Sequence, residues 1–317
     1  SIPILIDSTG LPNDIKCNFT AINNHNGVVS NEIRLIVAMD KNTGFPIYYQ
    51  YVPGNIVDVS TLENVIYNLI ELGVNIDKLI LDAGYYSESN ISALFNLNIH
   101  FMTRMPQHYS IYNLLVKKYS PIIRKLENSV NYGHREVFVI KTQIEPFKTK
   151  IPLYAYVCLD LNKQHEDYLR YREKHDYSKL TEEQYYNDCL KHGIFILIST
   201  LDLANNQLLP CYYSRQSIEQ FFDTIKNDID LLPLRTHKPI TFSGHLMISF
   251  ISNIIYFLID KQLKEKKLSF TKGLFSLSHH FARIYRNNII PNVPTKNIND
   301  ILKVLGINIS KQVPIKN

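Results

Sequence analysis

The chain has 317 residues, of which 45% are hydrophobic and 20% charged, so it is long and apolar enough for one large or two medium globular domains. That composition excludes a wholly disordered chain. The formal net charge of +5 permits a polyanionic partner without requiring one. Four cysteines without a C-x-x-C pair or short regular spacing indicate neither a zinc knuckle nor a disulfide framework, and they fit a reducing, cytoplasmic compartment.

The apolar segments point away from export and membranes. Nothing resembling a signal peptide precedes the first apolar run, and the chain begins without Met inside that run, so we expect an N-terminal portion to be missing. The longest apolar stretch, residues 246–258, falls short of the roughly 20 residues that cross a bilayer. We therefore expect a buried helix there and no membrane partner.

The first hundred residues alternate strand and helix patterns. Apolar runs predict five strands, two of them joined in a hairpin by the turn-rich residues 40–44, and apolar residues at helical spacing predict two helices. The strands are expected at 4–6, 34–39, 46–52, 78–82 and 100–103, and the helices at 57–72 and 87–97. This alternation indicates an α/β sheet.

The composition changes after residue 105. Residues 106–192 are richer in Lys, Tyr, Glu and His, with strands predicted at 136–143 and 153–159 and a charged helix at 166–191. The apolar run 194–199 resumes the buried-strand pattern, an amphipathic helix begins near Tyr212, and the last hundred residues are predicted to be helical. We therefore divide the chain into a first core part (1–105), an insertion (106–192) and the rest of the core with C-terminal helices (193–317).

Aspartates end several of the predicted strands. Asp7 and Asp82 do so, which places carboxylates at a sheet edge where α/β proteins often carry functional groups. Asp40 and Asp160 also end apolar runs, and Asp is common in turns for purely structural reasons. Position alone therefore does not separate a functional Asp from a structural one.

A helical segment carries the sharper signal. At about 100° per residue, Arg215, Glu219 and Lys226 fall within about 40° of one another, and Tyr212 lies near 60°. A neighbouring apolar stripe would hold the helix against a core. One interpretation is a solvated face with an Arg215–Glu219 pair worth about 0.3–0.5 kcal/mol. The other joins the glutamate to two strand-end aspartates, because three carboxylates can hold a pair of divalent cations for phosphodiester chemistry.

These residues resemble a known family. The spacing Tyr212-x2-Arg215-x3-Glu219-x6-Lys226 reproduces the Tyr-Arg-Glu-Lys signature of insertion-sequence DDE transposases of the fourth family. The resemblance runs from residue 4 to about 310. Four other segments are similar to that family's first-aspartate motif, the region between its aspartates, its second-aspartate motif and the turn after its signature helix. They are Ile6-Asp7-Ser8-Thr9, Gly44-Phe45-Pro46-Ile47 with Pro53-Gly54-Asn55-x-x-Asp58, Leu81-Asp82-Ala83-Gly84-Tyr85-Tyr86 and Gly244-His245-Leu246.

The resemblance implies an RNase H-like mixed sheet flanked by helices, with a β-rich insertion between the second Asp and the Glu. It implies that Asp7, Asp82 and Glu219 are the catalytic residues and bind two Mg²⁺ or Mn²⁺ ions. It also implies cut-and-paste transposition by a homodimer in a synaptic complex on double-stranded DNA, in the bacterial cytoplasm and without a nucleotide cofactor. The implied DNA contacts are Tyr212, Arg215 and Lys226, and the implied supports of the site are Gly84 and His245.

Two features depart from the family. Many members have Trp after the signature Arg, where this chain has Gln216, and the family's N-terminal DNA-binding segment is expected to be absent or truncated here. Two alternatives therefore stay open beside an active transposase. The chain could be an inactive, N-terminally truncated DNA-binding remnant, or a metal-dependent nuclease without strand transfer.

Overall fold

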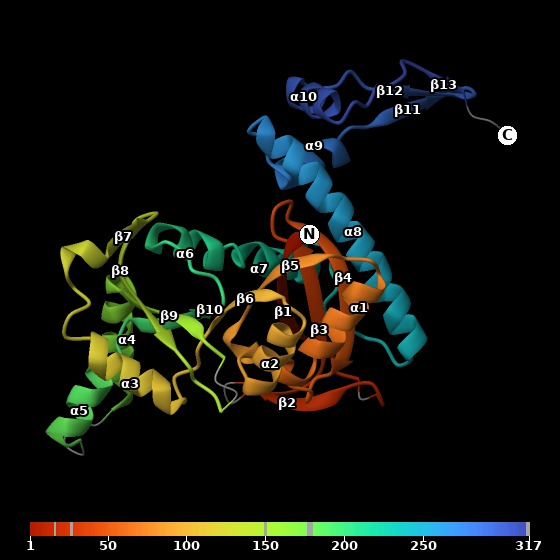
Figure 1. Cartoon of the computed structure of the whole chain (residues 1–317). Helices are drawn as coiled ribbons and strands as arrows, with labels where there is room; N and C mark the ends of the chain where they lie inside the picture. The colour runs from red at the N-terminus through yellow and green to blue at the C-terminus, as the bar shows by residue number, and fades with distance from the viewer. Residues whose placement is uncertain (16, 26–27, 149–150, 176–179, 315–317) are drawn as a thin grey trace.

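Figure 1 shows a computed structural model of the chain, which describes residues 1–15, 17–25, 28–148, 151–175 and 180–314. One large mixed sheet crosses the molecule in the order β2-β3-β1-β5-β6-β10-β9-β8-β7, and β4 pairs with β3 as well. Helices pack on both faces of this sheet. The predicted α/β class, a mixed sheet flanked by helices, is confirmed.

The first part of the chain forms the half of the sheet that carries the two aspartates. The antiparallel strands β3 and β4 form the predicted hairpin, and β5 and β6 run parallel to β1. The two predicted helices form as α1 and α2 and lie on one face of the sheet, whereas β2 was not predicted. The bounds are β1 (Ile2–Pro12), β2 (Ala21–His25), β3 (Val28–Asp40), β4 (Phe45–Pro53), η1 (Asp58–Ser60), α1 (Leu62–Glu71), β5 (Ile76–Leu81), η2 (Ala83–Tyr85), α2 (Glu88–Asn96) and β6 (His100–Arg104).

Strand β1 is buried on both faces, which explains its continuous apolar sequence. Ile4 and Ile6 pack with α1 and α2 on one face, while Leu5 and Leu11 pack on the other with the helices that follow residue 204. The prediction that a strand ends at Asp7 is wrong, because β1 continues pairing with β3 as far as Pro12. Asp7 therefore lies in the middle of a strand whose two faces pack against two different hydrophobic cores.

The strands of the predicted insertion extend the same sheet. Strand β10 pairs antiparallel with both β6 and β9, so the segment continues the core sheet from its β6 edge. The predicted helix 166–191 is wrong as one element, because two helices occupy its described part and residues 176–179 lie outside the described residues. The bounds are α3 (Ser110–Tyr119), η3 (Leu126–Asn128), β7 (Ser129–Tyr132), β8 (Arg135–Ile144), β9 (Leu153–Asp160), α4 (Leu161–Lys174), α5 (Glu182–Cys189) and β10 (Ile194–Ser199).

The last third is mainly helical, as predicted, but it ends in a small sheet that the sequence did not indicate. In Figure 1 that end, with α9 and α10, projects beyond the main sheet at the far end of α8. The bounds are α6 (Asn205–Tyr213), α7 (Gln216–Asp223), the π-helix η5 (Thr224–Asp228), α8 (Pro239–Glu265), α9 (Phe270–Ser278), β11 (Ala282–Tyr285), β12 (Asn288–Pro291), α10 (Lys296–Val304) and β13 (Val313–Pro314).

Helix α8 corrects two expectations. The turn expected at Gly244-His245-Leu246 is wrong, because these residues lie inside a helix of 27 residues. The expected burial of residues 246–258 holds for one side only. Phe242, Leu246 and Phe250 pack into the core, but only 28% of the most apolar 18-residue window of α8 is buried. Among the described residues, α8 is one helix that is long and apolar enough to cross a membrane, by length and composition alone.

Candidate active site

Asp7 and Asp82 lie side by side on neighbouring parallel strands. Ile6 of β1 pairs with Leu81 of β5, so each aspartate immediately follows a matched pair. The side chain of Asp7 is 12% exposed, whereas that of Asp82, at the point where β5 ends, is 43% exposed. The Thr103 hydroxyl of β6 donates to the Asp82 carbonyl at 2.9 Å and so fixes the backbone there. The strands therefore bring the two predicted carboxylates together.

The third predicted carboxylate, Glu219, lies near the two aspartates because all three side chains surround one arginine. The buried guanidinium of Arg215 contacts the carboxylates of Asp7 at 2.7 Å and Asp82 at 3.0 Å. It also lies 3.9 Å from Glu219, which is on the first turn of α7 and is 59% exposed. The structure therefore gathers the whole predicted triad around a single cation.

The helix that supplies these groups is not continuous. The prediction of one helix beginning near Tyr212 is wrong, because α6 already starts at Asn205 and the chain passes a tight turn at 214–215 before α7 begins. Backbone bonds from Ser217 to Ser214 and from Ile218 to Arg215 span only three residues, which tightens the helix there. This turn aims Arg215 at the aspartates.

Lys226 reaches the same face of β1 from η5. Its Nζ donates to the Thr9 hydroxyl at 2.6 Å. Thr9 is two residues after Asp7, and alternate residues of a strand point to the same face. Burial lowers the pKa of Lys226, and the negative charges of Glu32 and Asp223 oppose that shift. A cation therefore lies on the same face of β1 as Asp7, and the negative charges that act on it are those of Glu32 and Asp223.

Burial and charge act against each other at this site. Burial raises the pKa of Asp7 to about 6, the negative charge of Asp82 adds to the shift, and Arg215 opposes it. Burial also disfavours the charge on Arg215, but Asp7 and Asp82 outweigh it and raise the pKa of the guanidinium. One buried cation thus faces three carboxylates, which leaves an excess of negative charge.

The donor set fits a divalent cation in its chemistry. Mg²⁺ prefers carboxylate oxygens, and Asp7, Asp82 and Glu219 converge with more negative charge than Arg215 balances. In the part of the chain that the structure describes, no three acidic, His or Cys side chains form a ready metal site. The guanidinium lies between the acids, so a metal ion and Arg215 would compete for the same oxygens.

Tyr212 does not lie on an open surface. It is 5% exposed, and its hydroxyl accepts a hydrogen bond from Arg215 at 3.4 Å. Burial raises the pKa of Tyr212 to about 12, so the ring stays neutral. The buried ring packs against Arg215 and helps to hold it, and the DNA contact expected for Tyr212 stays a prediction.

The two residues expected to support the site differ. Gly84 lies in η2, two residues after Asp82, and a Cβ at this position would lie 2.9 Å from Oδ2 of Asp58. His245 lies in α8, where its Nε2 is 3.5 Å from the Leu231 carbonyl oxygen. Gly84 therefore packs against Asp58, whereas the contact of His245 is to the backbone that follows η5.

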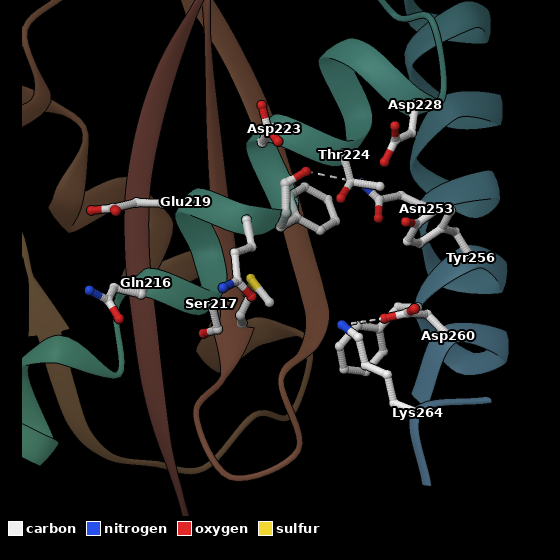
Figure 2. Close-up of a pocket in the computed structure, with 14 residues that line it drawn as sticks. Gln216, Ser217, Glu219, Asp223, Thr224, Asp228, Asn253, Tyr256, Asp260 and Lys264 are labelled. Carbon is white, nitrogen blue, oxygen red and sulfur yellow. Dashed lines mark hydrogen bonds and ion pairs between the residues drawn. The ribbon is translucent and has the colours of Figure 1, made fainter. Parts of the chain in front are cut away.

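A cleft of about 710 Å³ lies on the other side of α7, between α7 and α8 (Figure 2). Glu219 points out of this cleft and away from α8, whereas Asp260 and Lys264 pair on the α8 wall. Besides Glu219, three carboxylates line the cleft against one ammonium group, so it repels a phosphate backbone.

The sequence reasoning missed a second charged group behind the triad. Arg34 and Asp58 form an ion pair at 2.9 Å, and the Ser8 hydroxyl donates to the same Asp58 oxygen at 2.6 Å. Asp58 ends the Pro53-Gly54-Asn55-x-x-Asp58 segment, for which the family resemblance implies no role in the site. Arg34 could have been identified from the sequence as a charged residue at the start of an otherwise apolar predicted strand.

The comparison with protein families decides the kind of site. Residues 2–255 match the sequence model of the family described as "Transposase DDE domain". The chain belongs to the transposase DDE domain family. The matched stretch includes all three carboxylates, and the family is one of transposases that act through a DDE domain. The match is to this domain as a whole and does not single out the fourth insertion-sequence family.

Two solved structures are similar to this transposase domain over most of its length. The piggyBac transposase synaptic complex with hairpin DNA, solved by cryo-EM, shares 10% identity at a TM-score of 0.49, covering 96% of this chain and 51% of the other. The Drosophila P element transposase strand transfer complex shares 10% identity at 0.19, covering 95% and 56%. The chain thus spans about half of these proteins, and family membership rests on the domain match alone. A comparison with curated proteins finds no match.

Proposed function

We propose that the chain is the catalytic part of a DNA transposase that hydrolyses phosphodiester bonds at transposon ends and transfers the freed strands to target DNA. The observation that carries this proposal is the convergence of Asp7, Asp82 and Glu219 on Arg215 within a transposase DDE domain. The Tyr-Arg-Glu-Lys spacing favours the fourth insertion-sequence family, with an RNase H-like core divided at 1–105, 106–192 and 193–317. The chain would act in the bacterial cytoplasm, without a nucleotide cofactor.

The proposed site residues have two roles, metal binding and DNA binding. Asp7, Asp82 and Glu219 would hold two Mg²⁺ or Mn²⁺ ions. Such ions, when bound, stabilise the attacking and leaving oxygens of a phosphodiester displacement. Asp7 and Asp82 present oxygens from neighbouring strands, and the more exposed Glu219 completes the set from α7. Lys226 and Arg215 would offset phosphate charge, with Tyr212 holding Arg215 in place.

The test is nicking of double-stranded DNA that carries the ends of the chain's own element, with Mg²⁺ or Mn²⁺. We expect activity in the wild type, none in Asp82→Asn, and full activity in Asp40→Asn. Asp40 is a matched control, because it also ends an apolar strand but only accepts turn hydrogen bonds from Asn42 and Thr43. Equal activity in wild type and Asp82→Asn would reject the proposal. Products joined to target DNA distinguish a transposase from a nuclease.

The second part of the proposal is that α8 pairs two copies of the chain. Opposite its buried side, α8 exposes Ile248 (63%), Ile251 (47%), Ile255 (53%) and Leu258 (47%). Their spacing of three, four and three residues follows the seam by which two helices pack together. Asn253 of α8 donates to the Phe221 carbonyl of α7 at 3.1 Å. Because Asn253 is on the buried side of α8, pairing through the exposed seam would leave the α7 of each copy, with its Glu219, on the side away from the partner.

Sedimentation of the full chain tests this pairing. We expect a dimer in the wild type and a monomer in Ile251→Lys, with unchanged thermal stability because Ile251 is half-exposed. Ile22→Lys is the matched control, since Ile22 is 62% exposed on β2, outside α8, and should leave the dimer intact. A wild type that stays monomeric at all concentrations, or that binds lipid vesicles through α8, would reject a second copy as the partner of this face.

A further inference from the structure

The face of β1 opposite Asp7 carries a group of three hydrogen-bonded side chains. Ser8 follows Asp7, so its side chain points to the other face of the strand. The Ser8 hydroxyl donates to Asp58 Oδ1 at 2.6 Å, and a guanidinium nitrogen of Arg34 donates to the same oxygen at 2.9 Å. That nitrogen also lies 3.1 Å from the Ser8 hydroxyl oxygen. The residue next to the first aspartate is therefore tied to an ion pair.

The other oxygen of Asp58 meets the segment that follows the second aspartate. A Cβ on Gly84 would lie 2.9 Å from Asp58 Oδ2, closer than a real side chain approaches. Gly84 therefore lets the backbone of η2 pack directly on the carboxylate. Since Gly84 is two residues after Asp82, one side chain touches the neighbours of both site aspartates.

Asp58 is itself held firmly. It begins η1, and its carbonyl accepts hydrogen bonds from the backbone N–H and the hydroxyl of Thr61. The side chains of Arg34 and Asp58 are 13% and 17% exposed, so the pair is largely shielded from water. Arg34 lies on β3, paired opposite Gly10 of β1. The contacts thus join β1, β3 and the segments that start at η1 and η2.

We propose that Asp58, paired with Arg34, is a positioning residue that sets the spacing of Asp7 and Asp82. It contacts neither carboxylate of the triad. It fixes the backbone on each side of the gap between them, as outer-shell partners fix the ligands of metal sites. The proposal rests on the proposed function, since the spacing matters only if the two aspartates bind metal together.

The test is Mn²⁺ affinity, measured by titration calorimetry on the full chain without DNA, together with the kinetics of nicking. In Asp58→Asn we expect a Mn²⁺ affinity lower by about 10–100-fold and a lower kcat, with the KM for DNA unchanged. Asp77→Asn is the matched control, because Asp77 lies on the strand that leads to Asp82 but its side chain is 45% exposed. It should behave as wild type.

A merely structural role gives a different result. Asp58→Asn would then lower Tm, while the folded protein kept wild-type Mn²⁺ affinity and kcat, and this outcome would overturn the proposal. If Asp58→Asn does not fold, Gly84→Ala decides, because it keeps every charge and only pushes a methyl group against Asp58. We expect the same loss of Mn²⁺ affinity, and wild-type affinity in that variant would overturn the proposal.

The two proposals fail in different ways. Loss of Mn²⁺ binding and nicking in Asp82→Asn, with wild-type behaviour in Asp58→Asn and Gly84→Ala, would leave the proposed function standing and reject positioning by Asp58. A wild-type chain that neither binds Mn²⁺ nor nicks DNA would reject the proposed function, and the positioning role with it.

Discussion

On each face of β1 an arginine contacts aspartate, but the balance of positive and negative charge differs between the two faces. On the Ser8 face, Arg34 meets one carboxylate, Asp58. On the Asp7 face, Arg215 meets Asp7 and Asp82 and lies 3.9 Å from Glu219. Burying unbalanced charge is unfavourable unless another cation joins it. The balanced Arg34–Asp58 pair therefore stabilises the fold, whereas the excess negative charge around Arg215 can bind a further cation.

The largest expected effect comes from removing each arginine in turn. Without divalent ions, Arg215→Met and Arg34→Met should each lower the free energy of unfolding by about 3 kcal/mol, because each leaves carboxylate charge without its buried partner. With Mn²⁺, Arg215→Met should regain stability, since the ion takes the place of the guanidinium, whereas Arg34→Met should not. Urea unfolding with and without Mn²⁺ measures both.

A surface arginine provides the control for that comparison. Arg170 lies 3.7 Å from Glu166 with both side chains more than 60% exposed, so Arg170→Met should change the free energy of unfolding by less than about 1 kcal/mol. An equal response of Arg215→Met and Arg34→Met to Mn²⁺ would contradict the distinction between the two faces.

The next largest effect is a pH dependence from Asp7. Burial raises its pKa from 3.8 to about 6, so between these values the native state holds a proton that the unfolded chain has released. Stability from this residue is therefore highest below pH 3.8, falls as pH rises, and is lower by about 2–3 kcal/mol above pH 6. Asp7→Asn should remove that fall.

Urea unfolding in EDTA at several pH values between 4 and 7 checks this sign. The difference in unfolding free energy between wild type and Asp7→Asn isolates the one residue, because the other titrating groups are common to both. A difference that stays constant over this range would show that Asp7 keeps an ordinary pKa, and that Arg215 compensates its burial.

Much of the Asp7 face could be predicted from the sequence. Apolar runs that end at Asp7 and Asp82 predict strands that carry these aspartates, although β1 continues beyond Asp7, and helical spacing places Arg215 and Glu219 on one side. The angle of a helix position says which side a residue faces, but not which group it touches. The sequence therefore could not show that Arg215 binds the aspartates, or that Tyr212 is buried against it.

The Ser8 face was harder to predict for a physical reason. Asp58 and Arg34 are 24 residues apart: Arg34 pairs with Val52 across the β3–β4 hairpin, and Asp58 begins η1 beyond the end of β4, so no local spacing records the contact. The same limit applies to α8, whose apolar sequence is equally consistent with a core and with an exposed seam. Local patterns record which elements form, whereas long-range partners depend on the order of strands in the sheet.

The smallest effect expected here concerns Lys226, on the Asp7 face. Its ammonium group donates to the Thr9 hydroxyl, which accepts a hydrogen bond but carries no charge to neutralise it. Lys226→Gln should therefore weaken DNA binding about tenfold or less and lower the dependence of log affinity on log salt by about one. Binding measured at several salt concentrations gives this slope.

The control for Lys226 is Lys117, an exposed lysine on α3, for which Lys117→Gln should leave the slope unchanged. If Lys226→Gln also leaves it unchanged, the lysine does not meet a phosphate, and its role is to hold η5 against β1. A lower slope would instead mean that DNA approaches along the Asp7 face of β1. The balanced Arg34–Asp58 pair would then lie behind the strand, supporting the aspartates without contacting DNA.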